Sequence, residues 1–186
     1  MEKESECRLW ALKDPLLTEY HDHEWCKICH DDRTIFELLC LEGQSVGLSW
    51  RTIINKRKAY RDAFYNFDIE TCAKLSDDYL DSLLNNTELI RNKNKIYSIR
   101  SNAIAVKKII EQYGSLDKFV WSYTDGKQIV NHWKTFQEVP TQTDISKKMS
   151  RDFKKLGIAF VGPVITYSFM QSIGMVNDHL IDCPYR

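Results

Sequence analysis

The 186-residue sequence predicts an all-α domain of about eight helices with short connections. Apolar residues recur at helical spacing along most of the chain, as at Ile35, Leu38 and Leu39. The strand-like alternation of apolar and polar residues does not persist beyond segment 126–133. No internal repeat or low-complexity linker interrupts the chain. We therefore expect one domain over residues 1–186, as a single body or as two lobes around a central pocket.

The expected helices begin and end at local signals. The first has Asp32 as its N-cap, and the longest ends at Gly114 as a C-cap. The helix that follows starts from Ser115. The last has Pro163 in its first turn and Gly174 just past its end. In chain order the expected helices are 32–48, 49–64, 69–76, 77–86, 95–114, 115–127, 143–157 and 162–174.

Composition excludes several classes of protein. The 26 Lys and Arg balance 26 Asp and Glu, so any nucleic-acid surface must come from local segregation of charge. The first ten residues contain no apolar segment typical of a secretory signal. No apolar run reaches the ~18 residues of a membrane span. We expect a cytosolic chain without a membrane partner, whose six cysteines stay reduced.

Residues 26–30 read CKICH, which is compatible with c-type haem attachment, a redox pair or half of a zinc site. Haem attachment belongs outside the cytosol, and no export signal is visible. A redox pair of the thioredoxin type would need a preceding strand and a following helix. We interpret Cys26 and Cys29 as an incidental pair in a loop that leads into a helix.

Glu42 is the first candidate for chemistry. On a helix it lies on the same face as Ile35 and Leu38, so it points to the core or to a cleft. A buried carboxylate needs a partner, a proton or a ligand. Trp50 follows it closely, and Tyr20 and Trp25 precede it. A carboxylate among aromatic rings suits a nucleobase, whereas the alternative is a buried helix-capping carboxylate with aromatic residues that fill the core.

Segment 88–97 is the second candidate, as a turn between two helices that carries cations and asparagines. A helix N-terminus in such a turn favours phosphate, and asparagine tolerates a left-handed backbone. Basic clusters at 56–61 and 147–155 could extend this surface, or each could be an ordinary solvated helix face. The candidate DNA-binding residues are Arg91, Asn92, Lys93, Asn94 and Lys95.

A metal site is the third candidate. His179 and Cys183 are four residues apart, which places both side chains on one side of a helical turn. Cys7 and His21 could supply two further ligands of a tetrahedral zinc site. Spacing alone leaves other ligands open, namely His23, Cys26, Cys29 and His30.

Together these motifs resemble the bacterial DNA-3-methyladenine glycosylase I family over nearly the whole chain. The segments that carry the resemblance are 14–25, 41–50, 119–123, 160–163 and 167–183. The resemblance implies an all-helical fold of the helix-hairpin-helix glycosylase type. It also implies a monofunctional base-excision enzyme that releases 3-methyladenine from alkylated double-stranded DNA, acting as a monomer in the bacterial cytoplasm.

The resemblance also implies roles for individual residues. One structural zinc ion would join the two ends of the chain through four ligands. Glu42 would be the catalytic residue and would contact the flipped base together with Tyr20 and Trp50, with Trp25 and Trp10 as further candidates. Segment 89–96 would be the DNA-binding hairpin. The implied zinc ligands are Cys7, His21, His179 and Cys183.

Three departures from the family pattern stand out. Cys26 replaces a glycine that follows the Glu-Trp pair, which makes CKICH a local substitution. Glu88 and Asn94 occupy hairpin positions where the family has glycine, and Glu88 is unfavourable beside phosphate. One extra residue lies between Cys7 and His21. The alternative function is a non-catalytic helix-hairpin-helix DNA-binding protein, which would need no carboxylate in an aromatic pocket.

Overall fold

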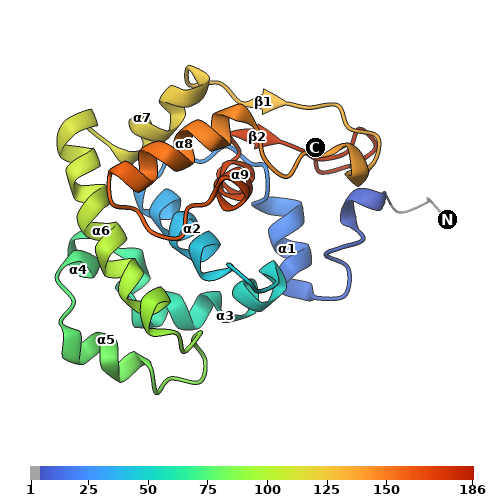
Figure 1. Cartoon of the computed structure of the whole chain (residues 1–186). Coiled ribbons are helices and arrows are strands. Elements are labelled where there is room, and N and C mark those ends of the chain that lie inside the picture. The colour runs from blue at the N-terminus through green and yellow to red at the C-terminus, as the bar shows by residue number, and fades with distance from the viewer. Residues whose placement is uncertain (1–4) are drawn as a thin grey trace.

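The computed structural model describes residues 5–186, so residues 1–4 of the predicted domain lie outside the described part. The described chain is mostly helical, as predicted (Figure 1). Two short strands, β1 (Ile129–Val130) and β2 (Val176–Asn177), pair in parallel. The α-helices are α1 (Pro15–His23), α2 (Asp32–Gln44), α3 (Trp50–Ala63), α4 (Ile69–Ala73), α5 (Asp77–Leu83), α6 (Lys93–Tyr113), α7 (Leu116–Trp121), α8 (Asp144–Lys155) and α9 (Pro163–Ser172).

Helix α2 occupies the centre of the molecule. Every residue from Ile35 to Gln44 is buried, and α3, α6, α7 and α9 pack around the helix (Figure 1). A helix that is buried on all sides holds any polar group on it away from bulk water. Glu42 is such a group, so its burial follows from the central position of α2.

The predicted boundaries at Gly114, Ser115 and Pro163 are confirmed. Gly114 ends α6 with φ 90°, a backbone conformation that glycine adopts without strain. The predicted N-cap of α2 is wrong by one residue, because Asp31 accepts the capping hydrogen bond. The carboxylate of Asp32 instead accepts the N–H groups of the first two residues of α7 and ties the two helices together.

Helix α1 was not among the predicted helices. It begins with a side-chain cap from Asp14 and with Pro15 in the first turn. Its buried face includes the polar residues His21 and Asp22, so apolar residues do not recur at helical spacing along this segment. The helix matters because it carries Tyr20 and His21 on adjacent positions.

The CKICH segment is a loop after α1, as predicted. The N–H groups of Cys26 and Cys29 donate to the carbonyls of Gln171 and Ile173, at 2.9 and 3.0 Å. This docks the loop on the end of α9. Cys26 has φ 63°, the left-handed conformation that favours glycine, so the glycine that the family resemblance implies would fit here without strain. Both cysteines are free thiols.

The two ends of the described chain lie together. The Ser5 hydroxyl donates to Asp182 at 2.8 Å, and a second apolar cluster around Cys7, Trp25 and Leu180 packs between these segments. Among the described residues, none of the helices combines the length and the hydropathy that a bilayer crossing would require.

Candidate functional site

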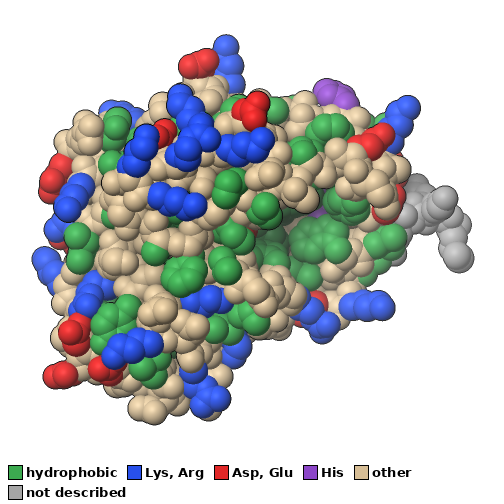
Figure 2. All heavy atoms as spheres, in the orientation of Figure 1, with side chains coloured by type: hydrophobic (Ala, Val, Ile, Leu, Met, Phe, Trp, Pro, Cys, Tyr) green, Lys and Arg blue, Asp and Glu red, His purple; other side chains and the backbone are tan. Residues whose placement is uncertain are grey.

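A cavity of about 480 Å³ opens between α1, α2 and α9. Figure 2 shows it as a hollow among hydrophobic side chains on the front face. Its walls come from three distant parts of the sequence: the N-terminal quarter, the loop after β1, and α9. The lining residues are Trp10, Tyr20, Trp25, Glu42, Ser45, Gly47, Leu48, Trp50, Phe136, Val139, Ile165, Ser168 and Gln171.

Glu42 lies in this cavity with 5% of its surface exposed. No hydrogen bond or ion pair joins its carboxyl group to the part of the chain that the structure describes. Burial raises the pKa of Glu42 to about 8, because the charged form loses its hydration. The carboxyl group is therefore mostly protonated at neutral pH.

Aromatic rings surround the carboxyl group. The ring centroids of Tyr20 and Trp50 are 5.4 Å apart, and Trp10 meets Trp25 edge to face at 5.6 Å. The Nε1 atom of Trp50 is buried and has no hydrogen-bond partner among the described residues. An indole N–H carries a strong preference for an acceptor, so a ligand with a ring acceptor would satisfy it. Burial, followed by the nearby Glu42 charge, raises the pKa of Tyr20.

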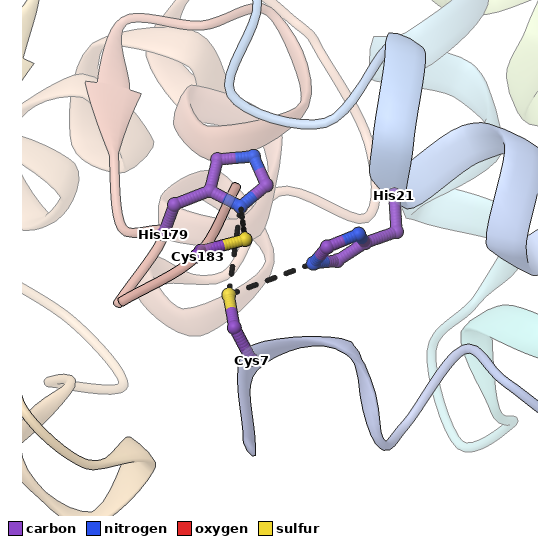
Figure 3. A group of neighbouring side chains, drawn as sticks. All are labelled: Cys7, His21, His179 and Cys183. Atoms are coloured by element: carbon purple, nitrogen blue, oxygen red, sulfur yellow. Dashed lines mark hydrogen bonds between the residues drawn. The ribbon is translucent and has the colours of Figure 1, made fainter. Parts of the chain in front are cut away.

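Next to the cavity, four buried side chains converge (Figure 3). The Sγ atom of Cys7 is 3.5 Å from both His21 Nε2 and His179 Nδ1, and Cys183 Sγ is 3.2 Å from His179 Nδ1. Their ligand atoms all lie within 4.8 Å of one another. Around a tetrahedral zinc ion with ordinary bond lengths, a sulfur and a nitrogen ligand are about 3.6 Å apart. The three sulfur–nitrogen distances are close to this spacing, so the four residues form a candidate site for such an ion.

The surroundings orient both imidazoles. His21 Nδ1 lies 2.8 Å from a carboxylate oxygen of Asp22, and His179 Nε2 lies 3.1 Å from the carbonyl of Trp25. Because both partners only accept, the proton sits on those nitrogens and the lone pairs face the cysteines. Burial lowers the pKa of His21, and it lowers the pKa of His179 to about 4, so both rings are neutral as metal ligands must be.

A buried carboxylate connects this cluster to the cavity. Asp178 accepts side-chain hydrogen bonds from Asn131, Trp133, Tyr167 and Gln171, each at 2.7 or 2.8 Å. These donors come from the loop after β1 and from α9, which both contribute to the cavity wall. The residue after Asp178 is His179, so one short segment fixes both the wall and the cluster.

The hairpin between α5 and α6 differs in part from the prediction. Asn92 is the N-cap of α6, with φ −121°, and Asn94 already lies in the helix. Neither has the left-handed backbone that asparagine in such a turn could adopt. Lys95 is wrongly assigned to the DNA-binding surface, because it is buried and its ammonium donates to the carbonyls of Gln44 and Val46 at 2.8 and 2.6 Å. It secures the end of α2 beside the cavity.

The family of the chain is shown by comparison with known proteins. The family model described as methyladenine glycosylase matches residues 10–186. The chain belongs to the methyladenine glycosylase family. It is 42% identical to the DNA-3-methyladenine glycosylase of Haemophilus influenzae, over 95% of this chain and 96% of that protein. It is 40% identical to DNA-3-methyladenine glycosylase 1 of Escherichia coli, over 94% and 93% of the two chains.

Solved structures agree with this assignment to the methyladenine glycosylase family. The chain superposes with a TM-score of 0.94 on a tyrosine-to-phenylalanine variant of 3-methyladenine DNA glycosylase I in complex with 3-methyladenine. The two share 37% identity over 97% of this chain and 96% of the other. A second crystal structure of 3-methyladenine DNA glycosylase I gives a TM-score of 0.90 at 43% identity, over 94% and 96%.

Within this family fold, the predicted site residues fall into three groups. Tyr20, Glu42 and Trp50 line one cavity, together with Trp10 and Trp25. The four predicted zinc ligands form one cluster, whereas His23 and His30 are not part of it. Of the five candidate DNA-binding residues 91–95, all but Lys95 are exposed.

Several cavity residues were not predicted. Phe136 and Val139 come from a short 3-10 helix (Phe136–Glu138) and its C-cap, a segment too short to show a periodic signal in the sequence. Ser168 and Gln171 fall inside a segment that carried the family resemblance. On α9 they lie three residues apart and so share a helix face, which is the signal that could have found them.

Proposed function

We propose that this chain removes 3-methyladenine from alkylated double-stranded DNA by hydrolysis of the N-glycosidic bond. The observation that carries the proposal is Glu42, a buried carboxyl group in an aromatic cavity that has no partner among residues 5–186. Burial of a carboxyl group without a hydrogen-bond or ion-pair partner costs free energy. A ligand that contacts the group would supply that partner, so the site is suited to binding one. Members of the same family are named for this activity.

The cavity acts on a base that has left the duplex, because a base inside the stack cannot reach Glu42. Methylation at N3 gives the nucleobase a positive charge. Contact with that charge favours the ionised form of Glu42, which accepts a hydrogen bond from the exocyclic amine. Tyr20 and Trp50 border the base plane, and the Trp50 N–H, which has no acceptor among the described residues, meets a ring acceptor of the base.

The bond between C1′ and N9 then breaks, and its electron pair moves to N9, so the base leaves as a neutral molecule. Water adds to C1′ and releases a proton. Since the methylated base is already a good leaving group, no strong general acid is needed. Preferential binding of the cationic base supplies much of the rate enhancement.

The Cys7, His21, His179 and Cys183 cluster holds one structural zinc ion in this proposal. Its support is the fit of the sulfur and nitrogen distances to a tetrahedron and the neutral, oriented imidazoles. A bound zinc ion would cross-link the two ends of the chain and would take no part in the reaction. The protein works as a monomer, and the exposed hairpin residues Arg91 and Lys93 contact the DNA backbone.

The proposal is tested by incubating the purified protein with methylated duplex DNA and identifying the released bases by chromatography. We expect 3-methyladenine as the main product. If every methylated base stayed in the DNA although the protein bound the duplex, only the alternative function, a non-catalytic DNA-binding protein, would remain. Release of a different alkylated purine in its place would contradict the assigned substrate.

A further inference from the structure

The loop between α2 and α3, residues 45–49, forms part of the rim of the cavity and is called here the rim loop. Ser45, Gly47 and Leu48 line the cavity, and residues 46–49 are all exposed. Glu42 lies in the last turn of α2, directly before the rim loop. A segment with few buried side chains depends on hydrogen bonds to its backbone for a fixed position.

Lys95, in the first turn of α6, supplies two of these hydrogen bonds. Its ammonium donates to the carbonyl of Gln44 at 2.8 Å and to the carbonyl of Val46 at 2.6 Å. Both carbonyls lie at the C-terminal end of α2, where backbone oxygens lack partners within the helix and carry partial negative charge. Because Lys95 is only 7% exposed, the cation and the carbonyls attract each other more strongly than they would in water. A buried cation therefore attaches the rim loop to α6.

A second connection joins the end of α2 to the other side of the hairpin. Gln44 is fully buried, and its Nε2 donates to the carbonyl of Lys95 at 2.9 Å. Its Oε1 accepts the hydroxyl of Tyr60 at 3.0 Å, and that hydroxyl accepts the N–H of Ile90 at 3.2 Å. Ile90 and Lys95 lie on either side of residues 91–94, the exposed part of the hairpin that contacts DNA in the proposed function. The hairpin and the rim loop therefore belong to one hydrogen-bonded unit.

We propose that Lys95 is a positioning residue, which sets the rim loop relative to the DNA-bound hairpin so that an extruded base can enter the cavity. The inference rests on the proposed function, since it takes the cavity as the place where the base binds. Lys95 does not touch the base in this role, because its ammonium stays on the carbonyls of Gln44 and Val46. Without these two hydrogen bonds the hairpin still binds DNA and the cavity still binds a free base, but the rim loop no longer follows the hairpin.

The test compares the wild type with Lys95→Met, which keeps the length of the side chain and removes its donors. A methylated strand with a single adenine is annealed to a complement that carries either thymine or an abasic analogue opposite that adenine. The single-turnover rate of 3-methyladenine release at saturating protein is measured on both duplexes. Opposite thymine we expect a fall of about 10- to 100-fold, the cost of a slightly misplaced positioning element. Opposite the abasic analogue, where extrusion breaks no base pair, the fall should be at least about threefold smaller.

The affinity for free 3-methyladenine, measured by tryptophan fluorescence, reports on the cavity itself. It should stay within about twofold in Lys95→Met, because Lys95 does not line the cavity. A general loss of structure would instead lower this affinity and slow release equally on the two duplexes. Either of those results would overturn the inference, as would release at the wild-type rate. If Lys95→Met does not fold, Lys95→Gln, which keeps one N–H₂ donor in the buried position, is judged by the same comparisons.

Lys56→Met is the matched control. The ammonium of Lys56 also donates to two backbone carbonyls, those of Thr87 at 3.2 Å and Glu88 at 2.9 Å, but both carbonyls belong to the hairpin segment and neither to the rim loop. Its release rate at saturating protein should stay within about twofold of the wild type. A fall as large as that of Lys95→Met would overturn the inference, because attachment of the hairpin alone would then explain both variants. Base release by the wild type tests the proposed function separately, since it depends on neither substitution.

Discussion

Gln171 donates a hydrogen bond from Nε2 to Oδ2 of Asp178 across 2.8 Å. The residue that follows Asp178 is the candidate metal ligand His179. The contact joins a wall of the cavity to the cluster that holds the chain ends together. Because Asp178 is fully buried, its charge depends on donors from the protein, and the donors in turn depend on it. The shape of the base pocket and the integrity of the cluster are therefore coupled.

Replacement of Asp178 by asparagine should reveal this coupling. An amide has one acceptor oxygen and one donor nitrogen, so two of the four donors would face an N–H₂ group. We expect a loss of about 3 kcal/mol in the free energy of unfolding, measured with urea. The exposed Asp125 is the control, because Asp125→Asn should leave the unfolding free energy within ~0.5 kcal/mol. Equal stability of the two variants would show that the four hydrogen bonds contribute nothing.

The stability of the protein should depend on pH through Glu42. Its pKa rises from the usual 4.5 to about 8 in the folded state, so the folded protein keeps a proton that the unfolded chain releases. Stability is then lost as pH rises from about 4.5 to about 8, by about 3 kcal/mol at pH 7. Glu42→Gln should remove this loss, so the free energy of unfolding of the variant should increase relative to that of the wild type as pH rises. The exposed Glu111→Gln variant is the control, and parallel pH profiles for all three proteins would contradict the burial argument.

Cys26 should show an inverted preference between glycine and alanine. Both substitutions remove the buried thiol, whereas only glycine relieves the left-handed backbone at φ 63°. We expect Cys26→Gly to be more stable than Cys26→Ala by about 1 kcal/mol in chemical denaturation. At an ordinary loop position the order is reversed, since alanine restricts the unfolded chain. A more stable alanine variant would mean that the loop can leave this conformation.

Metal removal tests the cluster. Elemental analysis should find one zinc ion per chain, and Cys183→Ser should lose it because an alcohol replaces a thiolate ligand. Chelation of the wild-type protein should lower its unfolding temperature, since a zinc ion held by these four residues would tie the first described residues to the last. Cys29→Ser is the matched control with a cysteine outside the cluster. Loss of zinc in the control, with retention in the Cys183 variant, would contradict the ligand assignment.

The sequence predicted those parts of the fold that local rules determine. Gly114 and Pro163 mark helix ends because their backbone preferences act within one turn. The position of Glu42 followed from the apolar face around it. Helix α1 was missed because its buried face includes the polar residues His21 and Asp22. A search for apolar residues at helical spacing counts such residues as exposed.

The rest of the site depends on contacts between distant segments. Lys95 looks like a surface cation in sequence, and only the carbonyls at the end of α2 turn it inward. Phe136 reaches the cavity from a single turn of 3-10 helix, which is too short for a sequence period to predict the direction of its side chain. The four candidate zinc ligands could be chosen only through the family resemblance, because the chain also has other histidines and cysteines at plausible spacing.

The central claim is that Glu42 recognises the cationic base in the cavity. The most direct measurement is the single-turnover rate of 3-methyladenine release from methylated duplex DNA by the wild type, Glu42→Gln and the Glu111→Gln control. Loss of a charge-assisted contact of about 3 kcal/mol predicts a fall of about 100-fold for Glu42→Gln and none for the control. A Glu42→Gln variant that is folded and releases the base at the wild-type rate would contradict the account.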